Sequence, residues 1–197
     1  ADVLSVFAGL RPLAKPEGDK KETKEISRGH KILISVSGLI TIIGGKWTTY
    51  RKMAEDTIDK AAMLGGFPER ACITHHMPIH GFRMDIDPYN DPLAVYGIHK
   101  EDILSLGEEE ENLSGFVSEK LGIRKAQVVW AVRKEMARTV EDVLARRTRS
   151  LFLDARESLR MAPEVAAIMA KELKQDKSWE EKQIAEFNTV AKNYYFE

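Results

Sequence analysis

Glycine and proline interrupt the middle of this chain so often that no long helix or strand is expected there. Between residues 63 and 98 they stand at Gly65, Gly66, Pro68, Pro78, Gly81, Pro88, Pro92 and Gly97. Glycine favours turns and proline lacks a backbone donor, so this stretch predicts a connector. The 197-residue chain is thereby divided into residues 1–62, the connector 63–98 and residues 99–197.

The first part has the pattern of mixed α/β structure. Apolar and β-branched residues predict a strand at residues 3–8, and because the chain enters a strand so early we expect it to be a fragment of a longer protein. After a polar loop, two more strands at residues 31–35 and 39–43 are joined through Gly38, which is typical of a hairpin. A helix is then predicted over residues 47–62.

The last part is predicted to be a mainly helical domain. One helix over residues 127–144 would place a continuous apolar stripe on one face, formed by Val128, Val132, Met136, Val140 and Leu144. Pro163 is suited to the first turn of a second helix. A final helix is expected from Trp179 onward.

Composition restricts the partners and the compartment. The chain has 30 Lys and Arg against 31 Asp and Glu, so its formal charge of −1 gives no bulk attraction to nucleic acid, and no nucleic-acid partner is expected. Its one cysteine, Cys72, fits a reducing compartment, so we expect a cytoplasmic location. The longest nearly apolar run, residues 32–43, is shorter than the roughly 20 residues of a membrane span.

A strand that ends in Gly44-Gly45-Lys46 and leads into a helix resembles a phosphate-binding loop. The motif G-x-x-x-x-G-K-[ST] is not met, because Ile40 and Trp47 stand where glycine and Ser or Thr are required, so triphosphate binding is not expected. Two glycines still let the backbone approach a flat or anionic group closely, and N–H groups at a helix start favour negative charge. A plain strand-to-helix turn is the structural alternative.

Arg11 and Arg28 flank the polar loop of the first part, each beside a predicted strand. If those strands are neighbours, both guanidinium groups can face one phosphate or carboxylate, for which their planar fork is suited. Two solvated surface arginines are the alternative.

A histidine group at His75, His76 and His80 has the residue type of a metal site. Pro78 breaks any helix that would aim these side chains together, and no cysteine or carboxylate completes the group nearby. We therefore expect no metal site.

Several of these segments together resemble the FAD-dependent, quinone-linked glycerol-3-phosphate dehydrogenases. The matching stretches are Gly9-Leu10-Arg11-Pro12-Leu13, Ile26-Ser27-Arg28, Gly44-Gly45-Lys46-Trp47-Thr48-Thr49-Tyr50-Arg51-Lys52-Met53-Ala54-Glu55 and the arginine-rich residues 138–149. Their order and spacing cover nearly the whole chain. Family members often carry leucine where this sequence has Trp47.

The resemblance implies a mechanism and a site. Glycerol 3-phosphate would pass a hydride from C2 to FAD and become dihydroxyacetone phosphate, and the electrons would go to quinone. Arg11 and Arg28 would bind the substrate phosphate. The turn formed by Gly44, Gly45, Lys46, Trp47 and Thr48 would bind the flavin. Lys46 would act catalytically, because its charge favours the reduced, more negative flavin.

The resemblance also implies that part of the FAD-binding site lies outside this sequence. No G-x-G-x-x-G occurs in the sequence, so the main FAD-binding half is expected upstream. Residues 1–62 would then be the C-terminal edge of the FAD and substrate domain. This chain alone would be inactive. Peripheral contact with the inner face of the cell membrane and a homodimer are open alternatives. So are the oxygen-using glycerol-3-phosphate oxidase relatives and a non-catalytic helical interaction module.

Overall fold

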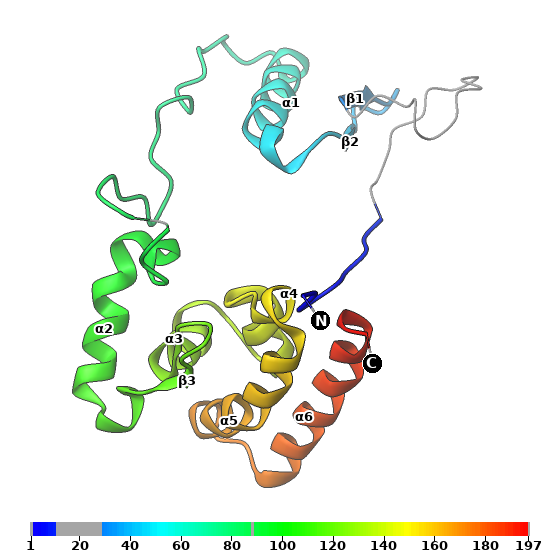
Figure 1. Ribbon diagram of the computed structural model, residues 1–197. Helices are drawn as coiled ribbons and strands as arrows, with labels where there is room; N and C mark the ends of the chain where they lie inside the picture. The colour runs from blue at the N-terminus through cyan, green and yellow to red at the C-terminus, as the bar shows by residue number, and fades with distance from the viewer. Residues whose placement is uncertain (1, 11–28, 88, 197) are drawn as a thin grey trace. The chain divides into compact units, whose positions relative to one another are not determined.

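The computed structural model describes residues 2–10, 29–87 and 89–196. Contacts divide the chain into two compact units, one built from Ala1–Ala8 and Ile79–Glu197 and the other from Gly9–Pro78. Figure 1 shows mostly helices, with only short strands. The predicted helical C-terminal domain is confirmed.

The Gly9–Pro78 unit contains the predicted hairpin. Strand β1 (His30–Ile34) pairs antiparallel with β2 (Ile40–Gly44), with His30 opposite Gly44 and Ile34 opposite Ile40. The connecting turn is closed by the Ser35 N–H, which donates to the Leu39 carbonyl at 3.0 Å. Gly38 has a φ of 84°, which a glycine adopts without steric cost.

A helix follows the hairpin, as predicted. A 3₁₀ turn, η2 (Trp47–Thr49), leads directly into α1 (Tyr50–Gly65). Gly66 caps the end of the helix, because its left-handed backbone (φ 65°) lets its N–H reach the carbonyls of Ala62 and Met63. Beyond it, the described residues 66–93 form turns without a regular helix or strand.

The other unit is mainly helical. Its elements are η3 (Ala94–His99), α2 (Lys100–Glu109), η4 (Glu111–Leu113), β3 (Phe116–Ser118), β4 (Ile123–Arg124), α3 (Lys125–Lys134), the π-helical turn η5 (Asp142–Arg147), α4 (Ser150–Leu153), α5 (Ala155–Leu173), α6 (Lys177–Ala191) and η6 (Lys192–Tyr194). The helix α5 packs against both α3 and α6 (Figure 1). Its buried side chains Met161, Val165 and Met169 lie at the centre of the core.

The single helix predicted over residues 127–144 is wrong, because α3 ends at Lys134. The Ala137 N–H donates to the Ala131 carbonyl at 2.9 Å, and Met136 between them has a φ of 59°. A residue with this left-handed backbone just past the last helical turn ends the helix and turns the chain away from the helix axis. The next helical segment then begins with a reciprocal cap: the Thr139 hydroxyl accepts from the Asp142 N–H at 3.1 Å, and the Asp142 carboxylate accepts from the Thr139 N–H at 3.0 Å. Met136 is 77% exposed and does not join the buried stripe.

Pro163 does not begin a helix; it lies inside α5. The helix begins eight residues earlier, where the Asp154 side chain accepts from the Glu157 N–H at 3.0 Å. Pro163 faces solvent, whereas the neighbouring Ala162 is buried. The final helix begins at Lys177, two residues before the predicted start, with Asp176 as its cap.

The strand predicted at residues 3–8 is wrong. This segment has no strand partner in the described part of the chain and instead lies along the C-terminal helices. The Val6 N–H donates to the Tyr194 carbonyl at 2.7 Å, and the Ser5 hydroxyl donates to the Leu151 carbonyl at 2.7 Å. These contacts group the segment with the helical unit, whereas the sequence pattern grouped it with residues 9–62.

None of the helices in the described residues combines the length and the apolar character that crossing a membrane requires.

Candidate functional site

The candidate site is the turn that joins β2 to α1. Gly44 and Gly45 have φ values of 74° and 84°, in the left-handed region that favours glycine. A β-carbon at Gly45 would lie 2.4 Å from the Met53 sulfur and 3.4 Å from the His30 β-carbon. Glycine is therefore favoured at position 45 by its backbone angle, whereas the end of the flexible Met53 side chain could move away from a β-carbon.

Lys46 caps the helix start with its backbone. The Thr49 N–H donates to the Lys46 carbonyl at 3.0 Å, and the Thr49 hydroxyl bonds to both the N–H and the carbonyl of Lys46. The N–H groups of Trp47 and Thr48 precede this first helical hydrogen bond, so the helix offers them no acceptor. Among the described residues, no carboxylate forms an ion pair with the exposed Lys46 ammonium group.

Aromatic surface lies beside these donors. Trp47 is 88% exposed, and its ring centroid is 6.0 Å from that of Tyr50, which is also exposed. The turn thus presents two backbone N–H groups, the Thr48 hydroxyl and one ammonium group next to apolar ring faces. Such a donor set fits a flat ring with several acceptor atoms that gains negative charge, so it could hold the pyrimidine edge of a flavin.

The first turns of α1 carry an ion-pair network behind the candidate site. Lys52 contacts Glu55 at 2.7 Å and Asp56 at 2.9 Å, and Arg51 also pairs with Glu55. Hydrogen bonds from Lys52 and Arg51 lower the pKa of Glu55 to about 2. The hydrogen bond from Lys52, with a further one from His30, lowers the pKa of Asp56. The 2.9 Å contact between His30 and Asp56 ties the helix to β1.

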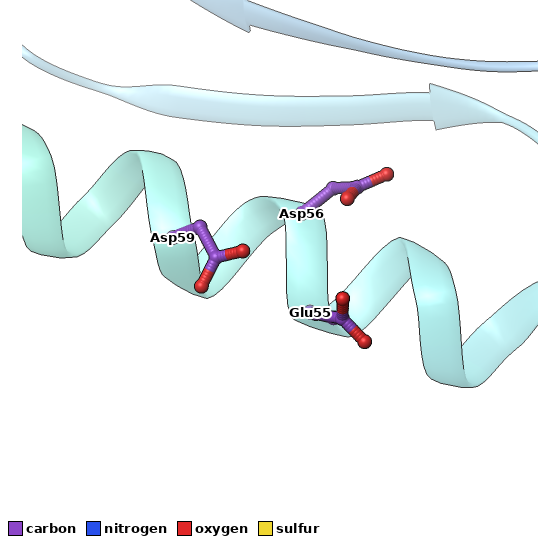
Figure 2. A group of neighbouring side chains, drawn as sticks. All are labelled: Glu55, Asp56 and Asp59. Carbon is purple, nitrogen blue, oxygen red and sulfur yellow. The ribbon is translucent and has the colours of Figure 1, made fainter. Parts of the chain in front are cut away.

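Three carboxylates, Glu55, Asp56 and Asp59, lie within 4.8 Å of one another on α1 (Figure 2). Two of them already have cationic partners, because Lys52 contacts both Glu55 and Asp56. Figure 2 shows Asp56 on the side of the helix toward the hairpin, where His30 meets it. The cluster is thus accounted for by ion pairs within the unit.

The structure brings together part of the predicted site. Gly44, Gly45, Lys46, Trp47 and Thr48 form one continuous turn. Arg11 and Arg28 lie outside the described residues, so their predicted phosphate site stays a prediction. Their role and that of Lys46 are taken up below as proposals.

Sequence reasoning missed the residues that shape the turn. Thr49 and Met53 belong to the Gly44–Glu55 segment, but the sequence predicted no role for either residue. In the structure Thr49 caps the helix and Met53 packs against Gly45. A signal for Thr49 was present, because a hydroxyl residue three positions after a helix cap can bond back to the cap's N–H. No local signal pointed to Met53.

Comparison with known proteins identifies the class. Residues 35–183 match the family described as the C-terminal domain of alpha-glycerophosphate oxidase, and this stretch is well over half of the chain. The chain belongs to this family, as its motifs predicted.

Among individual relatives, a probable mitochondrial glycerol-3-phosphate dehydrogenase of Dictyostelium discoideum is 36% identical over 194 residues, which cover 88% of this chain and 30% of that protein. The mitochondrial glycerol-3-phosphate dehydrogenase of Bos taurus is 34% identical, with 100% of this chain and 29% of that protein covered. That of Saccharomyces cerevisiae is 31% identical, with 92% and 34% covered. The chain therefore spans about a third or less of the length of these relatives.

Proposed function

We propose that this chain is part of a flavoprotein that oxidises glycerol 3-phosphate to dihydroxyacetone phosphate. The support is membership of the glycerophosphate oxidase C-terminal family, together with relatives that are named glycerol-3-phosphate dehydrogenases. The observation in the structure that carries the proposal is the β2–α1 turn. It holds the donors of the Gly-Gly-Lys-Trp-Thr segment on one surface.

Each part of the site has a proposed role. Bound FAD would supply the hydride acceptor. The Trp47 and Thr48 N–H groups would hold the acceptor atoms of its ring, and the Lys46 ammonium group would stabilise the negative charge that reduction adds. Arg11 and Arg28 would hold the substrate phosphate by charge-assisted hydrogen bonds.

The rest of the FAD site is proposed to lie in the upstream FAD-binding domain of the same protein. The sequence has no G-x-G-x-x-G segment, which a dinucleotide site of the Rossmann type needs. Among the described residues 29–78 none is buried, and apolar side chains such as Val36, Ile58 and Phe67 are exposed. A unit of this kind gains stability when further structure covers it. We therefore expect the isolated chain to be inactive and free of flavin.

The electron acceptor is proposed to be quinone, which would require peripheral contact of the whole protein with a membrane. The oxidase named in the family description favours oxygen as the second candidate. The relatives carry a mitochondrial location in their names, whereas the sequence of this chain favours the cytoplasm. A homodimer remains a proposal.

The role of Lys46 can be tested by the reduction potential of the flavin in the full-length enzyme. A hydrogen bond to a charged group contributes about 1.5–3 kcal/mol, which for a two-electron couple is about 30–60 mV. Lys46→Ala should lower the potential by that amount, and Lys46→Arg should retain most of it. Lys60→Ala, which removes an exposed lysine from α1, is the matched control. Equal potentials in the Lys46→Ala and Lys60→Ala enzymes would refute the role.

A further inference from the structure

Two histidines from separate segments meet in the helical unit, outside the site described above. His80 lies in the turn after Ile79, and His99 ends η3 just before α2. Their Nε2 atoms are 2.8 Å apart, and their ring centroids are 4.9 Å apart. Both side chains are accessible, since His80 is exposed and His99 is 29% exposed.

The backbone holds the two segments together independently of the rings. The Ile98 N–H donates to the Gly81 carbonyl at 3.1 Å. A β-carbon at Gly97 would lie 1.8 Å from the same carbonyl oxygen, so only glycine permits this approach. Because the neighbours of both histidines are fixed to each other, the two imidazoles face each other in a prepared geometry.

His99 is oriented for ligation by its surroundings. Its Nδ1 lies 3.1 Å from the Asp102 carboxylate, and its ring lies 5.3 Å from the buried Trp130 ring. An imidazole that donates its Nδ1–H to a carboxylate keeps a lone pair on Nε2, which without metal accepts a hydrogen bond from the His80 Nε2–H. Metal binding would replace this hydrogen bond, with the His80 proton on Nδ1. Metal-binding histidines almost always donate their other ring N–H to a carboxylate, a backbone carbonyl or water, and Asp102 is a partner of this kind.

We propose that His80 and His99 bind a divalent transition-metal ion of the zinc type through their Nε2 atoms. Zinc–nitrogen bonds of about 2.0–2.1 Å in a tetrahedral site place the two nitrogens about 3.3 Å apart, so the rings need to part by only about half an ångström. Water completes the coordination. The nearby Lys100 and Arg83 are paired with Asp91 and Asp85, which reduces their repulsion of a cation.

Calorimetric titration of the 197-residue protein with Zn²⁺ tests the proposal. The wild type should bind one ion per chain, and His80→Ala should weaken that binding at least tenfold. Asp102→Asn should weaken it about tenfold, the lower end of what loss of such a partner costs. His75→Ala/His76→Ala removes the other histidine pair, whose rings lie 6.3 Å apart, and should leave the affinity unchanged.

His99 packs on Trp130, so His99→Ala could also disturb folding, whereas His80 is exposed and its replacement spares the core. Circular dichroism of His80→Ala, which should match that of the wild type, is the folding control. Wild-type protein without a one-to-one site would overturn the proposal. So would an affinity that His80→Ala leaves unchanged or that the His75/His76 variant abolishes.

Discussion

The backbone at Met136 carries strain that its side chain does nothing to offset. A φ of 59° is rare for any residue with a β-carbon and costs about 1 kcal/mol. The side chain is 77% exposed, so it contributes little packing in return. The position is fixed by the backbone bond from Ala137 to Ala131, which ends α3.

Met136→Gly should therefore raise the free energy of unfolding by about 1 kcal/mol, because glycine adopts this conformation without the steric penalty. Met136→Ala keeps the β-carbon and should change stability by less than about 0.5 kcal/mol. Leu144→Ala, at a fully buried position of the same predicted stripe, should cost about 2–5 kcal/mol. Urea titration measures all three. Equal losses for Met136→Ala and Leu144→Ala would mean that Met136 is buried.

Individual site residues could be predicted where the signal lies within a few neighbouring residues of the sequence. Gly44 and Gly45 were identifiable because paired glycines after a strand signal backbone angles that other residues avoid. The end of α3 near Met136 could not be predicted, because the left-handed residue that follows a helix is usually glycine and a methionine there gives no signal. The pairing of His80 with His99 was also missed, since it joins residues 19 positions apart.

Among the elements, α5 is unusual because a proline lies well inside it. Pro163 lacks the N–H that would bond to the carbonyl four residues earlier. Helices tolerate an internal proline when the surrounding packing holds them together. Here Met161, Val165 and Met169 are all fully buried on the opposite side of the same helix.

Pro163→Ala should stabilise the helical unit by about 1–3 kcal/mol, because alanine restores the missing donor and removes the steric conflict. The exposed position makes a packing loss small. Ala167→Pro, at an exposed position one turn later in α5, should lower stability by a similar amount. Thermal or urea unfolding measures both. A loss of stability in Pro163→Ala would show that the proline supports the helix.

Elements stabilised by neighbouring residues were predicted well. The hairpin and α1 were expected within a few residues, since glycine turns and caps mark their ends. The segment at residues 3–8 was predicted as a strand from its composition alone. Its hydrogen bonds go to Leu151, Ala155 and Tyr194, and sequence pattern cannot show partners so far along the chain.

At the scale of the whole molecule, the two units differ in whether they have a buried hydrophobic core. The helical unit has a continuous core that includes Val140, Leu151 and Phe187. The described part of the Gly9–Pro78 unit buries no residue. This contrast agrees with the family assignment, in which the chain corresponds to about a third or less of its relatives. It also supports the proposal that the β2–α1 turn functions against the remainder of the flavoprotein.

The central proposal is that Arg11 and Arg28 bind the phosphate of glycerol 3-phosphate in the full-length enzyme. Steady-state kinetics of full-length Arg28→Ala with glycerol 3-phosphate and with glycerol tests it most directly, with Arg70→Ala as the exposed-arginine control. A charge-assisted contact contributes about 1.5–3 kcal/mol, so kcat/KM for glycerol 3-phosphate should fall about 10- to 100-fold. The value for glycerol, which has no phosphate, should change far less. If both values fall by the same factor, Arg28 does not recognise the phosphate.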